Sequence, residues 1–201
     1  MKKNVYLWSL ALLFAACGGA SHEGVEEAVN DADSTTSETM DEPEAEMTED
    51  EVVWDIVETD REAMRYVGMR STVSFDDMGP HFQEHMPKVG MAVGAVMTGP
   101  PVGIFWTWDE ENKESDMAVA VTVAEGDVEG LEVFEIEGGK ALMLVYYGAY
   151  DASYDAHMAI NKHMQDNGME MRDVVVEEYL TDPSNEPDTA KWQTNIYYML
   201  K

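Results

Sequence analysis

Two adjacent glutamates interrupt the most β-prone segment of the chain, VVVEEYLTDP, which runs from Val174 to Pro183. Successive side chains of a strand point to opposite faces, so Glu177 and Glu178 must face different surroundings. The same alternation puts Glu177 and Tyr179 on one face. A carboxylate beside aromatic rings suits an organic cation, because each ring adds about 0.5–2 kcal/mol of cation–π attraction. The segment is therefore chemically suited to hold an organic cation.

The same carboxylate is open to a second chemistry. A desolvated carboxylate can transfer protons, so Glu177 with Tyr179 could act as acid/base in a small-molecule hydrolase. No Ser-His-Asp or thiol arrangement accompanies these residues, and binding explains them without a reaction. Binding is the favoured class, and the hydrolase is the alternative. A purely structural module, with its cleft filled by side chains, is a third possibility.

The pentapeptide HFQEH, from His81 to His85, matches the H-x-x-E-H pattern of inverted zinc peptidases. Two histidines four residues apart can share a metal on one helix face, with Glu84 as base. Such peptidases are much larger, however, and Pro80 and Pro87 bracket a short helix here. We therefore expect solvent-facing histidines, no metal and no other cofactor.

The elements that must position these residues form an internal repeat. One copy runs from MRYVGMRSTVSF to MAVAVTV, and the second from KALMLVYYGAY to the closing TNIYYMLK. Each copy is predicted as a strand, a turn, a helix and two strands joined by a polar loop. In the second copy we expect strands at 141–147, 174–181 and 194–200 and a helix at 153–165. Two β-α-β-β units predict an α+β fold, in which one antiparallel sheet carries helices on one face.

Alternation along the strand at 174–181 also predicts which side chains face the helices. Val174, Val176, Glu178 and Leu180 form the more apolar set, so we expect this set to pack on the helices. Glu177 and Tyr179 would then point together onto the open face of the sheet. Glu178 lies at the edge of the predicted core without a partner that the sequence identifies.

Several short motifs carry a resemblance to a known family: GPPVGIFWTWDEEN, YYGAYDA, the GM…VVVEEYLTDP segment and TNIYYMLK. In this order they resemble the GyrI-like small-molecule-binding domain, the effector-binding domain of AraC-type and multidrug-responsive bacterial regulators. The resemblance covers about Arg61 to the end of the chain. It implies a concave sheet whose cleft binds hydrophobic, often cationic, compounds. It also implies a central acidic residue two before a tyrosine, a pattern that falls on Glu177 and Tyr179.

Aromatic side chains are expected to wall this cleft, and the candidates are Phe105, Trp108, Tyr147, Tyr179 and Tyr197. Two positions depart from the family pattern. Asn195 stands where a second acidic residue is common, and Phe105 replaces a frequent tyrosine. No helix-turn-helix segment precedes the domain in this sequence, so the transcriptional role of the regulators is not expected.

The N-terminal residues, MKKNVYLWSLALLFAACGG, indicate export. The apolar run from Val5 to Phe14 is too short to span a bilayer, and residues 1–16 suit a signal peptide. LFAAC resembles the lipobox of bacterial lipoproteins, which implies that Cys17, the only cysteine, is lipidated. The lipid would anchor the protein to a membrane of the bacterial cell envelope, in the periplasm or at the cell surface. Ordinary cleavage after Ala16 is the alternative.

Residues 17–59 have the composition of a tether between this anchor and a domain at 60–201. They contain no Lys or Arg and many Asp, Glu, Ser and Thr residues, so we expect an acidic, disordered segment. VVWDIV near its end could already form an edge strand. The formal net charge of the chain, −29, repels phosphate backbones and argues against nucleic-acid binding. The oligomeric state is left open.

Overall fold

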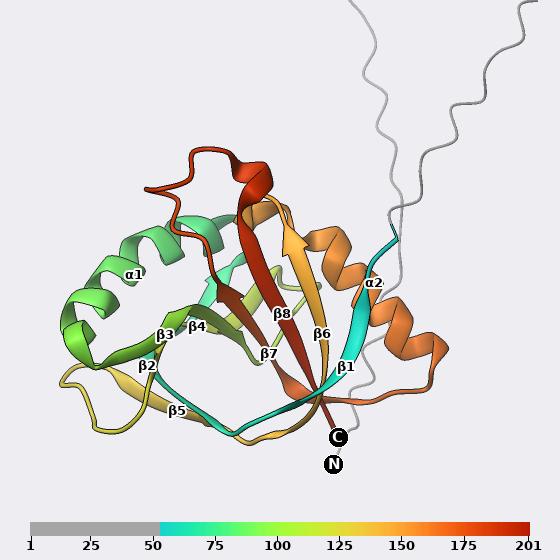
Figure 1. Ribbon diagram of the computed structural model, residues 1–201, viewed down its shortest axis with the longest axis horizontal. Coiled ribbons are helices and arrows are strands. Elements are labelled where there is room, and N and C mark those ends of the chain that lie inside the picture. The colour runs from blue at the N-terminus through green and yellow to red at the C-terminus, as the bar shows by residue number, and fades with distance from the viewer. Residues whose placement is uncertain (1–52) are drawn as a thin grey trace, which may run out of the picture. The chain divides into compact units, whose positions relative to one another are not determined.

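The computed structural model describes residues 53–201, and the predicted signal peptide, Cys17 and most of the predicted tether lie outside the described residues. The described part is a duplicated β-α-β-β unit, as predicted (Figure 1). The first copy contains strand β2 (Met64–Ser74), helix α1 (Met78–Val93) and strands β3 (Met97–Phe105) and β4 (Glu114–Val123). The second contains β6 (Gly139–Tyr147), α2 (Tyr154–Asp166), β7 (Met171–Tyr179) and β8 (Gln193–Leu200).

Eight strands form one antiparallel sheet in the order β1-β6-β8-β7-β3-β4-β2-β5. The two copies meet where β7 pairs with β3, and Glu177 lies opposite Gly103 at this junction. Strands β1 (Ile56–Arg61) and β5 (Glu132–Ile136) lie outside the repeat and extend the sheet at its two edges. Strand β1 begins at Ile56, before the boundary predicted at residue 60, and supplies an edge strand where VVWDIV ends.

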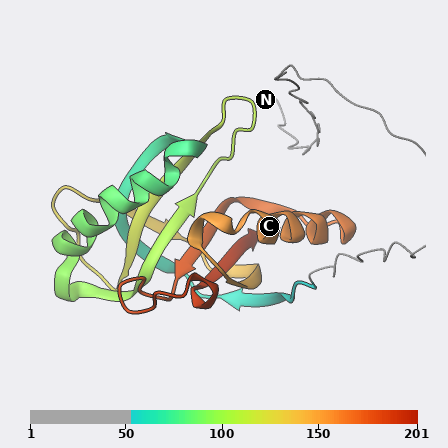
Figure 2. The same ribbon diagram turned by 90° about the horizontal axis from the view of Figure 1, so that it is seen from above.

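Both helices lie on one side of the sheet (Figure 2). Helix α2 buries Ala156, Ile160 and Met164, which recur every four residues, against strands β6 and β8. Helix α1 packs Val89 and Val93 on β2 and β4 and continues through Pro87, which was expected to end it. Proline removes one backbone hydrogen bond from a helix interior. The apolar residues beyond Pro87 keep the last turns of α1 on the sheet.

The opposite side of the sheet is also buried, because the sheet curls until its two ends face each other (Figure 1). One cluster joins Tyr66 and Phe134 of β2 and β5 to Val174, Val176 and Met199 of β7 and β8. The prediction that Val174 and Val176 pack beneath the helices is therefore wrong. These valines fill the inside of the curled sheet, so no face is left open at this position.

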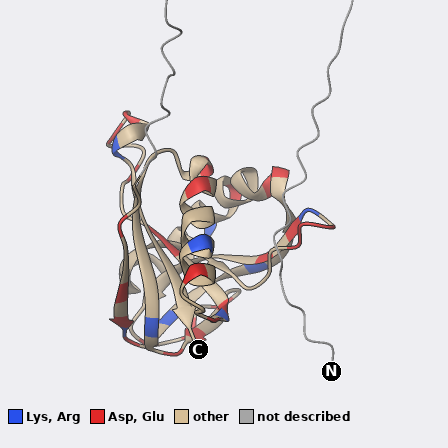
Figure 3. Cartoon of the chain, turned by 90° about the vertical axis from the view of Figure 1, so that its right-hand side faces the viewer, with Lys and Arg blue, Asp and Glu red and all other residues tan. Residues whose placement is uncertain are grey.

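Four short 3-10 helices complete the described fold: η1 (Phe75–Asp77), η2 (Gly94–Val96), η3 (Tyr150–Ala152) and η4 (Thr189–Lys191). Neither α1 nor α2 is sufficiently long and apolar to cross a membrane, and residues 53–201 contain no other α-helix. Asp and Glu are spread over strand ends, loops and helix α2, with fewer Lys and Arg among them (Figure 3). The described surface is accordingly acidic.

Candidate functional site

Glu177, near the C-terminal end of β7, is the centre of a buried polar cluster. Its exposed fraction is 5%, and both carboxylate oxygens have hydrogen-bond partners. The imidazole Nε2 of His157 lies 2.7 Å from Oε1, and the hydroxyl of Tyr179 donates to Oε2 over 2.7 Å. A buried carboxylate is tolerated only when such partners compensate for lost water. Glu177 is thus a buried carboxylate whose lost hydration is replaced by hydrogen bonds to His157 and Tyr179.

Glu177 lies on the helix side of the sheet, so the prediction of an open face is wrong. His157 belongs to α2, and Val175, which shares the face of Glu177, packs with Ile160 and Met164. Alternation correctly grouped Glu177 with Tyr179. The choice between the faces failed because both faces are buried, and the more apolar set of residues fills the inside of the curled sheet.

Aromatic rings from both copies of the repeat meet around Tyr179. Phe82 of α1 contacts its ring edge-to-face, with centroids 4.9 Å apart, and Tyr150 of η3 lies 4.8 Å away. Trp192 packs on Tyr150, again with centroids 4.8 Å apart. Burial, and next the neighbouring Glu177 carboxylate, raise the pKa of Tyr179 well above its usual value. The phenol therefore stays protonated and remains a donor to the carboxylate.

A sharp turn after β6 positions Tyr150 in this cluster. Gly148 has a φ of 156°, and a Cβ at this position would lie 2.1 Å from the hydroxyl oxygen of Tyr146. Only glycine fits this turn, since other residues would clash with the tyrosine. The chain then enters η3, where the Tyr150 hydroxyl donates to the carbonyl of Thr181, just beyond β7. The YYGAYDA motif is thus the local cause of the Tyr150 position.

Gly103 and Phe105 of β3 lie on the β3 side of the cluster around Glu177. A Cβ added to Gly103 would lie 2.9 Å from both the Tyr179 hydroxyl oxygen and Cε2 of Phe105. The missing side chain lets the tyrosine hydroxyl and the phenylalanine ring lie over the backbone of β3. Phe105, one of the predicted cleft walls, therefore lies in the same cluster as Tyr179.

The structure brings three of the six predicted ligand-binding residues together, Glu177, Tyr179 and Phe105, and separates the other three. Trp108 stacks on Phe75, with ring centroids 4.2 Å apart, in the segment that follows β3. Tyr147 is 60% exposed. Tyr197 pairs with Val176 and faces the inside of the curled sheet.

Four members of the cluster were not predicted: Phe82, Tyr150, His157 and Trp192. His157 follows Ala156 and precedes Ile160 by about one turn of α2, so it lies next to the helix face that packs on the sheet. This position could have indicated that His157 reaches the sheet. Tyr150 stands inside a motif that the sequence singled out, YYGAYDA. Phe82 and Trp192 contact the cluster through packing between distant segments, for which the sequence offers no pattern.

Glu178 has its own partners on the other face of the sheet. It forms an ion pair with Arg61, whose guanidinium also donates to the Tyr66 hydroxyl over 2.9 Å. The same guanidinium lies 4.0 Å from the centre of the Tyr197 ring. Burial raises the pKa of Tyr66 to about 12, so this phenol is neutral as well. The glutamate without an identified partner is therefore held by a permanent cation.

The histidines of HFQEH do not form a metal site in the described chain. The rings of His81 and His85 contact each other, with centroids 4.1 Å apart, and both residues are half-buried instead of solvent-facing. Glu84 points to solvent and pairs with Lys88 over 2.6 Å. No group of three His, Cys, Asp or Glu residues within 53–201 is arranged to hold a metal ion.

Comparison with known proteins gives both a family and a fold. The family model of the GyrI-like small molecule binding domain matches residues 55–201. No match was found among curated proteins. The solved C-terminal domain of EcmrR has a TM-score of 0.65 and 19% identity, covering 75% of this chain and 99% of that one. SAV2435 bound to tetraphenylphosphonium has a TM-score of 0.57 and 14% identity, covering 75% of this chain and 94% of that one.

A third solved structure, a putative transcription regulation protein from Staphylococcus aureus MU50, has a TM-score of 0.53 and 13% identity. The alignment covers 74% of this chain and 98% of that protein. At these identities the three structures show a shared fold. They support the antiparallel sheet with helices on one face that the repeat predicted and the concave shape that the family resemblance implied.

Proposed function

The chain belongs to the GyrI-like small molecule binding domain family through residues 55–201, and from this membership we propose that it binds hydrophobic organic cations at Glu177. The single observation that carries the proposal is a carboxylate with 5% exposure at the junction of the two repeats, surrounded by aromatic rings. The ligand would lie against Tyr179, between Phe82 of α1 and Tyr150 of η3.

The physical chemistry of this cluster favours a bulky cation. A charge interacts more strongly with a carboxylate in a low-dielectric interior than in water. The faces and edges of Phe82, Tyr150 and Tyr179 add cation–π and apolar contact. The structural neighbour SAV2435 is described as bound to tetraphenylphosphonium. This ion has no hydrogen-bond donor, so charge and aromatic contact must hold it, and the present cluster supplies both.

A ligand must separate rings that contact one another in the structure. The Phe82 and Tyr150 rings lie within 5 Å of the Tyr179 ring, measured between centroids at 4.9 and 4.8 Å. Phe82 is carried by α1 and Tyr150 by the short η3 segment, so the two walls belong to different copies of the repeat. Movement of η3 or of α1 would open the site without breaking the central β3·β7 pairing.

Isothermal titration with tetraphenylphosphonium tests the proposal. Glu177→Gln keeps the side-chain size but removes the charge, and we expect affinity to fall at least tenfold, about 1.4 kcal/mol. Asp173→Asn is the matched control, because Asp173 is an exposed carboxylate on the same strand. This control should bind like the wild type. Equal affinities of wild type and Glu177→Gln would reject Glu177 as the anchor.

We also propose that the binding domain is anchored to a membrane of the cell envelope through Cys17. The support is the resemblance of LFAAC to a lipobox and the acidic composition of residues 17–59, which would serve as a spacer. Growth with labelled palmitate should label the wild type and leave Cys17→Ala unlabelled. Equal labelling of the two proteins would end this part of the proposal.

An acid/base hydrolase is the second candidate, and the His157–Glu177 contact is the observation in its favour. An imidazole held by a carboxylate can transfer protons during a reaction. The Tyr198 hydroxyl lies 3.0 Å from the other ring nitrogen of His157. Burial raises the pKa of Tyr198, however, so this phenol is a poor nucleophile. Incubation with a panel of electrophilic small molecules should show no turnover that depends on Glu177 or His157.

A further inference from the structure

We propose that His157 is the resident counter-cation of Glu177, and that an organic cation binds by replacing the imidazolium at this carboxylate, with release of a proton. The inference rests on the proposed function, since it concerns how the same site takes its ligand. It assigns to His157 the role of setting both the charge that the ligand meets and the pH at which it binds.

The contact between the two side chains is close and shielded from water. Nε2 of His157 lies 2.7 Å from Oε1 of Glu177, and the side chains are 21% and 7% exposed. Within residues 53–201, His157 is the only basic side chain that contacts this carboxylate. The other partner, Tyr179, is a neutral donor. The net charge at the centre of the site therefore depends on whether His157 carries one proton or two.

Both protonation states of His157 find hydrogen-bond partners. An imidazolium donates from both nitrogens, and the Glu177 carboxylate and the Tyr198 oxygen can accept. A neutral imidazole that keeps its Nε2 proton still donates to Glu177, and Tyr198 then donates its hydroxyl proton to Nδ1 over 3.0 Å. The charge can thus change while both ring nitrogens of His157 remain paired.

Among the described residues, the side chains that hydrogen-bond to His157 and Glu177 add no second charge to this pair. Strand β7 presents Glu177 and the Tyr179 phenol, and β8 presents the Tyr198 phenol. Burial raises the pKa of both phenols, so neither ionises in the range where imidazoles titrate. Glu177 is the charged group that faces the imidazole from the sheet.

Glu178 on the other face provides the contrast. Its partner is Arg61, and a guanidinium stays charged at every physiological pH. A histidine, in contrast, changes charge between about pH 5 and pH 8. Of the two adjacent glutamates, only Glu177 therefore has a counter-cation that can lose its charge. A cationic ligand would compete with the imidazolium at low pH and meet an uncompensated carboxylate at higher pH.

The consequence is a linkage between ligand and proton. At acidic pH, where a histidine is charged, each bound cation should release up to one proton, and affinity should rise by up to tenfold for each pH unit. At alkaline pH, where a histidine is neutral, affinity should become constant. A neutral ligand of the same shape gains no charge from the loss of the imidazolium, so the site should prefer cations most strongly at the higher pH.

Calorimetric titration of the wild-type protein with tetraphenylphosphonium between pH 5.5 and 8.5 tests the inference. We expect affinity to increase with pH, and buffers of different ionisation enthalpy to reveal proton release at the acidic end of this range. His157→Gln keeps a donor for Glu177 but cannot titrate, so its affinity should be nearly independent of pH and higher than that of wild type at pH 5.5. His163→Gln on the same helix is the matched control and should behave like the wild type.

The outcomes separate this inference from the proposed function. Binding with the same pH slope in the wild type and in His157→Gln, or wild-type binding without proton release, would overturn the role of His157 and leave the binding function intact. The proton-release measurement needs no variant, so it decides the matter even if His157→Gln is unstable. Absence of binding by the wild type at every pH would overturn both proposals.

Discussion

Glu177 and Glu178 are adjacent in β7, and their side chains lie on opposite faces of the sheet. Each carboxylate contacts a basic side chain on its own face. His157 reaches Glu177 from α2, and Arg61 reaches Glu178 from the end of β1. The two carboxylates are thus separated by the sheet and differ in the chemistry of their partners. One has a titratable partner on the side of the proposed ligand site, and the other a permanent partner inside the curled sheet.

Replacing Arg61 with Met should destabilise the fold without changing the proposed ligand site. The Arg61 and Glu178 side chains are 9% and 15% exposed, and removal of one partner of a buried pair costs about 3–5 kcal/mol. Urea unfolding would measure this loss. Arg61→Met combined with Glu178→Leu should recover much of it, because no buried charge is left alone. A single variant as stable as the wild type would contradict the structural role of the pair.

Gly103→Ala should disturb the proposed ligand site directly. The new methyl group would stand 2.9 Å from the Tyr179 hydroxyl oxygen and from the Phe105 ring, so one of them must move. We expect a loss of about 1–3 kcal/mol in unfolding free energy and weaker binding of tetraphenylphosphonium. The control is Gly90→Ala in α1, where a Cβ meets nothing within 4 Å. This second variant should be as stable as the wild type or slightly more stable.

Tryptophan fluorescence should report ligand binding through Trp192. Its ring lies 4.8 Å from that of Tyr150, which walls the proposed site, whereas Trp108 stacks on Phe75. Titration with tetraphenylphosphonium should change the emission of the wild type and of Trp108→Phe. The change should be largely lost in Trp192→Phe. The reverse pattern would favour the cleft wall that the sequence suggested at Trp108.

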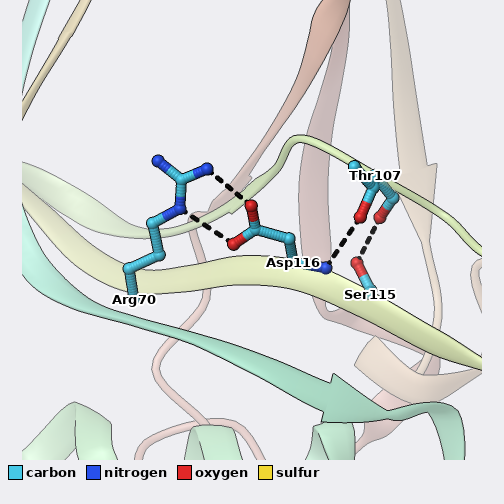
Figure 4. A network of polar contacts seen from close by, with 4 residues as sticks. All are labelled: Arg70, Thr107, Ser115 and Asp116. Carbon is cyan, nitrogen blue, oxygen red and sulfur yellow. Dashed lines mark hydrogen bonds and ion pairs between the residues drawn. The ribbon is translucent and has the colours of Figure 1, made fainter.

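Asp116→Asn should reduce stability in a manner that depends on pH. The Arg70 guanidinium bonds to both oxygens of Asp116, at 2.8 and 2.5 Å, beside the contacts that join Ser115 and Asp116 to Thr107 (Figure 4). This pairing lowers the pKa of the Asp116 carboxyl. A carboxyl group whose pKa is lowered by folding stabilises the protein at pH values above its ordinary, unfolded-state pKa of about 3.9. This stabilisation is lost as the pH falls through the pKa of the folded state.

Both side chains of this pair are partly exposed, so we expect a difference of about 0.2–1 kcal/mol between wild type and Asp116→Asn at pH 6. Urea unfolding at pH values from 6 down to 3 should show the difference shrinking below about pH 4. A difference that stays constant or grows toward acid would mean that the charge of Asp116 is not the source of the stabilisation.

Much of the fold was accessible from local patterns. The alternation in 141–147 and 194–200, the helical spacing before Gly168, and the similarity of the two halves were sufficient for the β-α-β-β repeat, because these periodicities come from backbone geometry. Strand β5 was not predicted, since five residues, EVFEI, are too few to establish a period of two. The continuation of α1 beyond Pro87 was also not predicted, since it depends on contacts of Val89 and Val93 with β2 and β4.

The candidate site divides in the same way. Alternation alone grouped Glu177 with Tyr179 and separated both from Glu178, because neighbouring residues of a strand cannot share a face. Which face carries Glu177 and the proposed site was decided by the curl of the sheet, which buries Val174 and Val176 inside and leaves Glu177 beneath α2. The partners of the two glutamates, His157 and Arg61, come from segments 20 and 117 residues away. Contacts over such separations arise from packing of the whole chain, and no local period encodes them.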